Sequence, residues 1–301
     1  MSAIHQPVLV EEVIEFLRIR PEGNYIDATV GTGGHALEIA RRLTTGKLVG
    51  IDKDPRALEI AQARLRPHQR NVILVHSSFT RVAEIREGLG VGKVDGVLAD
   101  LGVSTLQLAS LERGFSFLAA GPLDMRMDTD QRTTAADIVN QWDEERLADL
   151  LYRLGEEKKS RRIARAIVRA RPLRDCAHLA TVVAGAQRAK GRQKLHPATK
   201  TFLALRIAVN RELEELEQFL TRAPATLLPA GRFVVLSYHS LEDRIVKQKF
   251  RDLAQAGTLK LVTKKVVRPK RTEVHANPRA RSARMRVAEK KTEPSKPVLI
   301  I

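Results

Sequence analysis

The sequence predicts an α/β fold in which a doubly wound, mostly parallel sheet is interrupted by an inserted all-helical domain. Apolar, strand-like runs alternate with helical patterns over the first hundred residues, as in parallel sheets covered by helices on both faces. No strand-like run follows between about Leu106 and Ala225, and strand character returns only at Gly231–Ser237. Because sheet strands are usually joined by a short connection or a single helix, so long a gap indicates an insertion.

The first part of the chain contains four expected strands. Asp54 is a plausible N-cap, and Pro55 stands at a first-turn position, so a helix is expected to open there. The strands are expected at Asn24–Val30, Leu48–Asp52, Val72–Ser77 and Val94–Asp100, and the helices at His35–Leu43, about Pro55–Leu65 and Thr80–Leu89.

The rest of the chain divides into the insertion and the completion of the sheet. We therefore expect a first sheet segment at 1–105, an inserted helical domain at 106–220 and a second sheet segment at 221–301. The helical patterns of the insertion are Ala135–Leu154, Ser160–Ala170, Leu179–Ala189 and about Pro197–Leu220. The second sheet segment contains the strand Gly231–Ser237, the helix Leu241–Ala256, the strands Leu259–Val267 and Arg284–Ala288, and a loose tail over Thr292–Ile301.

Composition excludes several classes of protein. Of the 301 residues 43% are hydrophobic, which suits a packed core and excludes a disordered chain. No apolar run approaches the ~18 residues that a membrane span needs, and the N-terminus does not read as a secretory signal. The only cysteine, Cys176, excludes a disulfide framework and a Cys-rich zinc site. We expect a cytoplasmic protein.

Charge points to a polyanionic partner. The formal net charge is +17, and residues 260–301 hold 13 Lys and Arg against 3 acidic residues. Such a field attracts nucleic acid, although a basic surface without a dedicated partner is the open alternative. Aromatic residues make up only 4% of the chain, which argues against a surface of stacked bases. We expect nucleic acid held through phosphates and shape.

A glycine-rich loop is the strongest local motif. Asp27–His35 (DATVGTGGH) follows the first strand and opens a helix, so the backbone can turn sharply and present free N–H groups to a ligand. Asp52 ends the next strand, 21 residues after Gly31, where an acid meets ribose hydroxyls in doubly wound folds. Together they predict a site for an adenosine-containing cofactor.

The loop pattern alone fits two cofactors, because Gly31–Ala36 also matches the G-x-G-x-x-G/A loop of NAD-binding proteins. Asp27 and Asp100, both at strand ends, favour the cationic S-adenosylmethionine and would repel a diphosphate. The two closing strands favour a methyltransferase sheet by analogy. An NAD-dependent dehydrogenase is the alternative.

A series of motifs in the right order resembles the MraW family. The resemblance implies a class I (Rossmann-like) methyltransferase sheet with a helical insertion, S-adenosylmethionine as donor, and methylation of the N4 amino group of a cytidine in bacterial small-subunit (16S) ribosomal RNA. The motifs are His5–Leu9, Asp27–His35, Asp95–Leu108, Arg113–Phe117, Gly121–Asp128, Ser160–Ala164, His196–Phe202 and His239–Arg244.

The same resemblance implies the residues of the site. Cytosine N4 has its lone pair delocalised into the ring, so a carboxylate that accepts from the amino group would help the reaction. Asp100 is the candidate for that catalytic role as well as for cofactor binding. The aromatic partner of the target base stays open among Phe115, Phe117 and Tyr238. The cofactor-binding residues implied are Gly33, Gly34, His35, Asp52, Phe79, Asp100 and Gln107.

Other polar clusters have plainer interpretations. No metal site is expected, because the residues around His196 and Ser240–Asp243 are better explained as helix caps. The basic stripe Lys158–Arg169 fits a solvated helix face or RNA phosphate contact.

The expected partner is small-subunit ribosomal RNA within an assembled or assembling 30S particle. The sequence leaves open whether the chain forms a homodimer, and a non-catalytic ribosome-associated RNA-binding factor is a further alternative.

Overall fold

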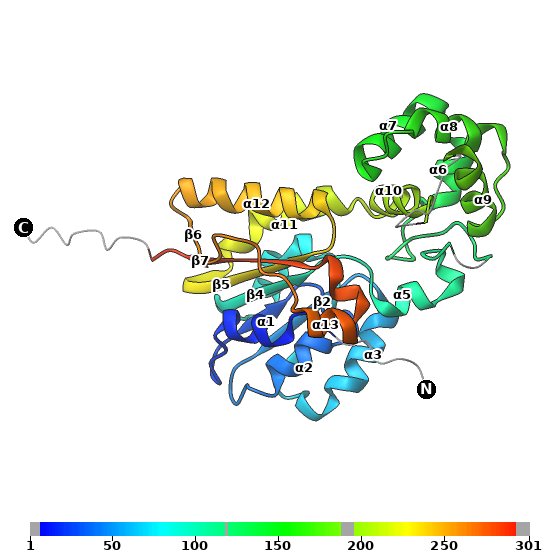
Figure 1. Cartoon of the computed structure of the whole chain (residues 1–301). Helices are drawn as coiled ribbons and strands as arrows, with labels where there is room; N and C mark the ends of the chain where they lie inside the picture. Colours follow the sequence, from blue (N-terminus) through cyan, green and yellow to red (C-terminus); the bar gives the residue numbers. More distant parts are fainter. Residues whose placement is uncertain (1–6, 118–119, 188–195, 293–301) are drawn as a thin grey trace, which may run out of the picture. The chain divides into compact units, whose positions relative to one another are not determined.

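A single seven-stranded sheet forms the framework of the protein (Figure 1), in the order β3-β2-β1-β4-β5-β7-β6. The computed structural model describes residues 7–117, 120–187 and 196–292, so His5, Gln6 and the tail from residue 293 lie outside the described residues. The first five strands are parallel, and β7 runs antiparallel to β5 and β6. The strands are β1 (Tyr25–Asp27), β2 (Leu48–Asp52), β3 (Val72–His76), β4 (Val94–Asp100), β5 (Leu227–Ser237), β6 (Leu259–Leu261) and β7 (Arg284–Lys290).

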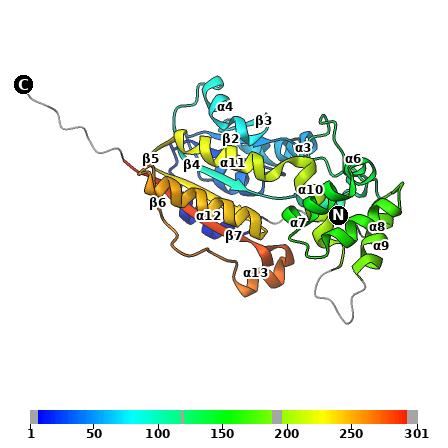
Figure 2. The same cartoon turned by 90° about the horizontal axis from the view of Figure 1, so that it is seen from above.

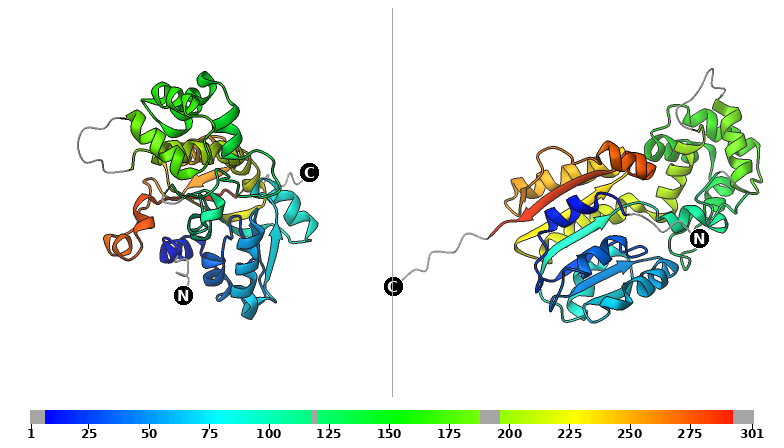
Figure 3. Two further views of the ribbon diagram at one scale, coloured as in Figure 1. Left: turned by 90° about the vertical axis from the view of Figure 1, so that its right-hand side faces the viewer. Right: turned by 60° about the horizontal axis from the view of Figure 1, so that its bottom comes forward.

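Helices cover both faces of this sheet, each over its own apolar core. α1, α2 and α3 pack with Leu98 and Val234 on one face, whereas α4, α11 and α12 pack with Val97 and Phe233 on the other. The right-hand view of Figure 3 shows α1 in blue and α12 in orange on opposite sides of the red strand β7. The helices are α1 (Val10–Leu17), α2 (Gly34–Ala40), α3 (Pro55–Leu65), α4 (Val82–Gly88), α11 (Glu212–Arg222), α12 (Ser240–Gln255) and α13 (Arg271–Ala276).

The chain separates into two compact units, residues 1–102 with 214–301 and residues 103–213. The second unit is helical (Figure 2). It has its own core, which includes Leu147, Ile163 and Leu205. The predicted fold class, a doubly wound sheet with an inserted helical domain, is confirmed. Within the described ranges, no helix is long and apolar enough to cross a membrane. The helices of the insertion are α5 (Thr105–Ala109), α6 (Ala135–Gln141), α7 (Glu144–Gly155), α8 (Ser160–Arg169), α9 (Cys176–Gln187) and α10 (Thr199–Asn210).

Two helices predicted as continuous are each divided in two. The pattern Ala135–Leu154 breaks at Asp143, whose side chain accepts from the Arg146 N–H at 2.7 Å and thereby caps a new helix, α7. The pattern Pro197–Leu220 breaks at Arg211, which ends α10 with a φ of +50° before α11 begins. Neither break carries Gly or Pro, so the 3.6-residue periodicity runs through both of them unmarked.

The last two strands and one cap also differ from prediction. The expected strand Leu259–Val267 pairs continuously only as β6, because the Val262 and Thr263 N–H groups both donate to the Val287 carbonyl and disturb the register. Its far end survives as the isolated bridge of Val267 to Met285. The capping box of α12 lies one residue earlier than predicted and is formed by His239 and Glu242 instead of Ser240 and Asp243.

Helix α10 is not capped as expected either. Its N-cap is Ala198, which makes no side-chain cap. His196 accepts a hydrogen bond at Nδ1 from the Ala198 N–H at 3.2 Å, outside the helix itself. The predicted cap at Asp54 is confirmed, because its carboxylate accepts from the Arg56 N–H at 3.1 Å.

Candidate functional site

Acidic residues end three neighbouring parallel strands at one edge of the sheet. Asp27 ends β1, Asp52 ends β2 and Asp100 ends β4. The register pairs Asp27 with Gly50 and Leu98, so the three carboxyl groups belong to the same edge. This is the edge at which open α/β sheets bind their ligands.

The glycine loop after β1 is shaped by left-handed backbone. Gly33 has a φ of +82° and stands at the N-cap of α2, and a Cβ there would lie 3.4 Å from the Ala61 Cα. Gly31 has a φ of +52°, and its N–H donates to Asp52 Oδ2 at 2.8 Å. The other oxygen of Asp52 accepts from the Asp54 N–H at 2.9 Å. Asp52 therefore also holds the loop in place.

Asp27 is almost completely buried beneath this loop. Its Oδ1 accepts from the Thr29 N–H at 3.2 Å. Burial raises the pKa of Asp27 to about 7, and the neighbouring charge of Asp100 adds to this effect, whereas His35 opposes it. Near neutral pH this carboxyl group is thus poised between its charged and neutral forms.

Asp100 is held on both of its oxygens. The Tyr238 hydroxyl, at the end of β5, donates to Oδ1 at 2.7 Å, and His35 Nδ1 lies 3.5 Å from Oδ2. Burial raises the pKa of Asp100, and His35 and the Tyr238 hydrogen bond both lower it again. Burial and the charge of Asp100 in turn hold the pKa of the Tyr238 hydroxyl well above its usual range.

The protonation of His35 follows from its other nitrogen. Nε2 lies 2.9 Å from the Val8 carbonyl oxygen, which can only accept, so Nε2 carries a hydrogen. Nδ1 then attracts Asp100 only when a second proton lies on Nδ1 or on the carboxyl group. A hydrogen bond between His35 Nδ1 and Asp100 Oδ2, which lie 3.5 Å apart, therefore requires a hydrogen between these two atoms.

The electrostatics of this edge suit a cationic ligand. Among the described residues, no lysine or arginine side chain forms an ion pair with Asp27, Asp52 or Asp100. Asp27 is buried and Asp52 and Asp100 are partly buried, so their charged forms are costly, and a bound cation would relieve that cost. The Thr32 hydroxyl in the loop is buried and has no hydrogen-bond partner in the part of the chain that the structure describes, which marks a further polar atom available to a ligand.

Two predicted residues have other contacts in the structure. Phe79 begins the short helix η2 (Phe79–Arg81) after β3, and its ring packs edge-on against Phe219 with centroids 4.9 Å apart. Gln107 belongs to the helical unit, where it forms a capping box with Ser104 at the start of α5. The structure brings Gly33, Gly34, His35, Asp52 and Asp100 together in one unit but does not place Gln107 relative to them.

The three candidates for stacking on the target base are also divided between the units. Phe115 and Phe117 are in the helical unit, where Phe117 lies flat on His196 with ring centroids 4.6 Å apart. Tyr238 is in the sheet unit and touches Asp100. The sequence did not predict its hydroxyl as a partner of Asp100. Tyr238 directly follows a predicted strand, however, and the carboxyl ends of parallel strands meet at one edge, so the contact could have been expected.

Comparisons with known proteins identify the family. The MraW methylase family matches residues 2–291. Ribosomal RNA small subunit methyltransferase H of Solibacter usitatus is 52% identical over 286 residues, covering 95% of this chain and 99% of the relative. The protein of the same name from Koribacter versatilis is 50% identical, covering 95% and 94%. A putative rRNA-methylase structure from Clostridium thermocellum aligns with a TM-score of 0.44 at 12% identity, covering 93% and 94%. The chain belongs to the MraW methylase family.

Proposed function

We propose that this protein transfers a methyl group from S-adenosylmethionine to the N4 amino group of a cytidine in small-subunit ribosomal RNA, in the bacterial cytoplasm. The observation that carries the proposal is the family membership, together with relatives named as small-subunit ribosomal RNA methyltransferases that match nearly the whole chain. A methylase family leaves the dehydrogenase alternative without support. The assembled or assembling 30S particle is the proposed form of the substrate.

The residues at the sheet edge fit S-adenosylmethionine. We assign the loop glycines Gly33 and Gly34 with His35 to its methionine part, and Asp52 to the ribose hydroxyls. Asp27 and Asp100 supply negative charge that suits a sulfonium and an ammonium group. Phe79 and Gln107 complete the proposed binding set. The Thr32 hydroxyl, which has no hydrogen-bond partner among the described residues, and the raised pKa values of Asp27 and Asp100 support a ligand that is both polar and cationic.

Asp100 is the proposed catalytic residue. The bound cofactor supplies an electrophilic methyl group, so the protein's part is mostly alignment and proton handling. A carboxylate that accepts a hydrogen bond from the cytosine amino group localises its lone pair. Methylation also releases one proton from that nitrogen, and the ionised carboxylate of Asp100 can take it up.

The helical unit offers a second surface for RNA. Arg161, Arg162, Arg165 and Arg169 on α8 are all exposed, and Arg165 also lies 3.3 Å from Glu144. The buried face of α8 packs into the helical core through Ile163 and Ile167, so the basic side chains project away from that core. We propose that part of this stripe contacts phosphates.

The test replaces Asp100 with asparagine and measures single-turnover methyl transfer to purified 30S particles. We expect turnover to fall by about 10²–10⁴-fold, the usual share of acid–base help, with particle binding within about twofold of wild type. Asp95→Asn is the matched control, because Asp95 lies on the same strand at the opposite end. Equal losses of turnover and binding would contradict the catalytic role. No methyl transfer by the wild-type protein would favour the non-catalytic RNA-binding alternative.

A further inference from the structure

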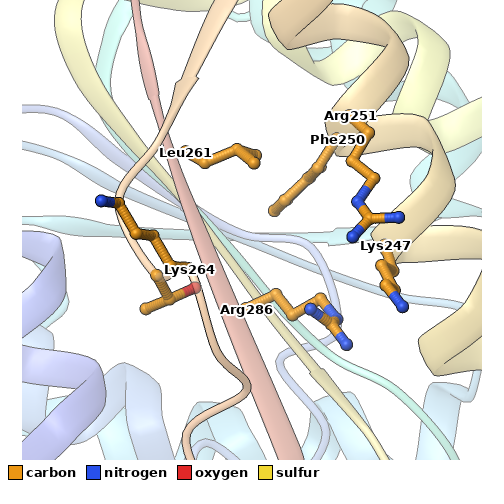
Figure 4. A pocket seen from close by; sticks show the side chains of 7 residues that line it. Lys247, Phe250, Arg251, Leu261, Lys264 and Arg286 are labelled. Atoms are coloured by element: carbon orange, nitrogen blue, oxygen red, sulfur yellow. The ribbon is translucent and has the colours of Figure 1, made fainter.

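A small basic pocket lies between α12 and the β6–β7 edge of the sheet unit. Its volume is about 130 Å³, which is enough for several water molecules and for a phosphate group. Figure 4 shows the cationic ends of Lys247, Arg251 and Arg286 on one side of it and Lys264 across the strand. The lining residues are Lys247, Phe250, Arg251, Leu261, Thr263, Lys264 and Arg286.

The cations of this pocket are mostly uncompensated. Arg286 is held by Asp243 through bonds of 2.7 and 3.2 Å. Among the described residues, none forms a side-chain hydrogen bond or an ion pair with Lys247, Arg251 or Lys264. Asp252, the other acid nearby on α12, accepts from Gln248 at 2.9 Å. Of the four cations that line the pocket, Arg286 is thus paired with an acid, and the other three are exposed and available to an anion.

The walls of the pocket are rigid. Lys247 and Arg251 are four residues apart on α12 and therefore share one face of the helix, and Phe250 beside them is buried in the core under the sheet. The Thr263 hydroxyl accepts from the Val287 N–H at 2.9 Å, which ties the far wall to β7. The backbone on both sides of the pocket is thus held by packed elements, while the side chains of Lys247, Arg251 and Lys264 are exposed.

The pocket lies on the α12 face of the sheet, whereas Asp100, two residues after Leu98, belongs to the face that α1, α2 and α3 cover. Arg286 is paired with Val235, whereas Arg284, two residues earlier on β7, is paired with Ser237 at the carboxyl end of β5. Two strand residues span about 7 Å. The pocket is thus displaced along β7 from the edge that carries Asp100 and Tyr238, on the side of the chain that holds most of the positive charge.

We propose that this pocket binds a backbone phosphate of the RNA substrate. Phosphate oxygens suit the combination of guanidinium and ammonium groups. The inference rests on the proposed function for its choice of RNA over a free phosphate ion. The contact fixes the position of the strand without reading its sequence.

The test compares two double variants of equal charge change. Lys247→Gln with Arg251→Gln removes two pocket cations, and Arg66→Gln with Arg70→Gln removes two exposed cations beside β3, at the opposite edge of the sheet. Binding of 30S particles is measured between 50 and 300 mM salt with the full chain. Thermal melts and S-adenosylmethionine titrations establish that each variant is folded and binds cofactor.

We expect the pocket variant to bind particles about 5- to 25-fold more weakly near 0.1 M salt and to lose about 0.7–1.4 from the slope of log K against log salt, as for one or two single-strand phosphate contacts. The control variant should match wild type. Equal behaviour of the two variants would overturn the proposal. Tight binding of inorganic phosphate to the wild-type protein without competition by particles would also overturn it, in favour of a free anion. If the wild-type protein transferred no methyl group but the two variants showed the expected difference in salt slope, the result would count against the proposed function and would support the phosphate pocket.

Discussion

Replacing Tyr238 with phenylalanine removes one hydroxyl and leaves the ring in place. That hydroxyl donates to Asp100 at 2.7 Å, and the bond is one of the two influences that keep the buried carboxyl group ionised. Asp100 accepts most strongly from an amino group, and can take up the proton that the amino group releases, only when it is ionised. The variant is therefore expected to need a higher pH for full activity, with little loss of maximal turnover.

The size of the effect follows from the strength of the bond. A hydrogen bond to a charged group contributes about 1.5–3 kcal/mol, which is about a 10- to 150-fold change in an ionisation equilibrium. The acid limb of the kcat/KM profile should thus move to higher pH by between about one and two pH units. Above that limb, the rates of variant and wild type should converge.

The assay is single-turnover methyl transfer to 30S particles between pH 5 and 9. Tyr25→Phe is the matched control, because Tyr25 is also buried and its hydroxyl accepts from the Arg20 N–H at 2.7 Å at the opposite end of the sheet. The control should lose stability without moving the acid limb. An unmoved acid limb in Tyr238→Phe would refute the view that this hydroxyl keeps Asp100 charged.

Two further substitutions test the other acids of the edge. The pKa of Asp27 is raised from 3.8 to about 7, so its contribution to stability is present below pH 4 and lost as pH rises through 7. Between pH 4 and 8, the free energy of unfolding in urea should fall by roughly 4 kcal/mol more for wild type than for Asp27→Asn. Equal falls in the two proteins would contradict this. Asp52→Asn should weaken S-adenosylmethionine binding by about 1–3 kcal/mol in calorimetry, whereas Asp54→Asn, which keeps a good helix cap, should not; equal affinities would remove Asp52 from the ribose site.

The strands β2, β3 and β4 could be predicted closely from the sequence because each is a short apolar run ending on a polar residue, whereas the strands expected at Asn24–Val30 and Leu259–Val267 are shorter in the structure. The expected strands Leu48–Asp52 and Val94–Asp100 match β2 and β4 residue for residue. Local signals fail where the cause is tertiary. The helix break at Arg211 has a positive φ without a glycine, so no residue type in the sequence indicates it.

The candidate site was predictable in part for the same reason. Strand ends bring Asp27, Asp52 and Asp100 to one edge, and this depends only on the alternation of strands and helices. The contact of Tyr238 with Asp100 joins residues 138 positions apart, and the contact of His35 with the Val8 carbonyl depends on how the chain before α1 is folded. Neither contact produces a periodic pattern in the sequence, so both could be recognised only in the structure.

The opposite charges of the protein's surface and its proposed site serve different ligands. A net charge of +17 attracts a polyanion from a distance, but the same field disfavours a cationic cofactor. Buried carboxylates at the strand ends offset this locally, because charges interact more strongly where water is excluded. Their raised pKa values show the cost of that burial. A cationic ligand that lowers this cost also holds the carboxylates in their ionised form, so its binding should strengthen as pH rises through neutrality and prepare Asp100 to accept from the RNA base.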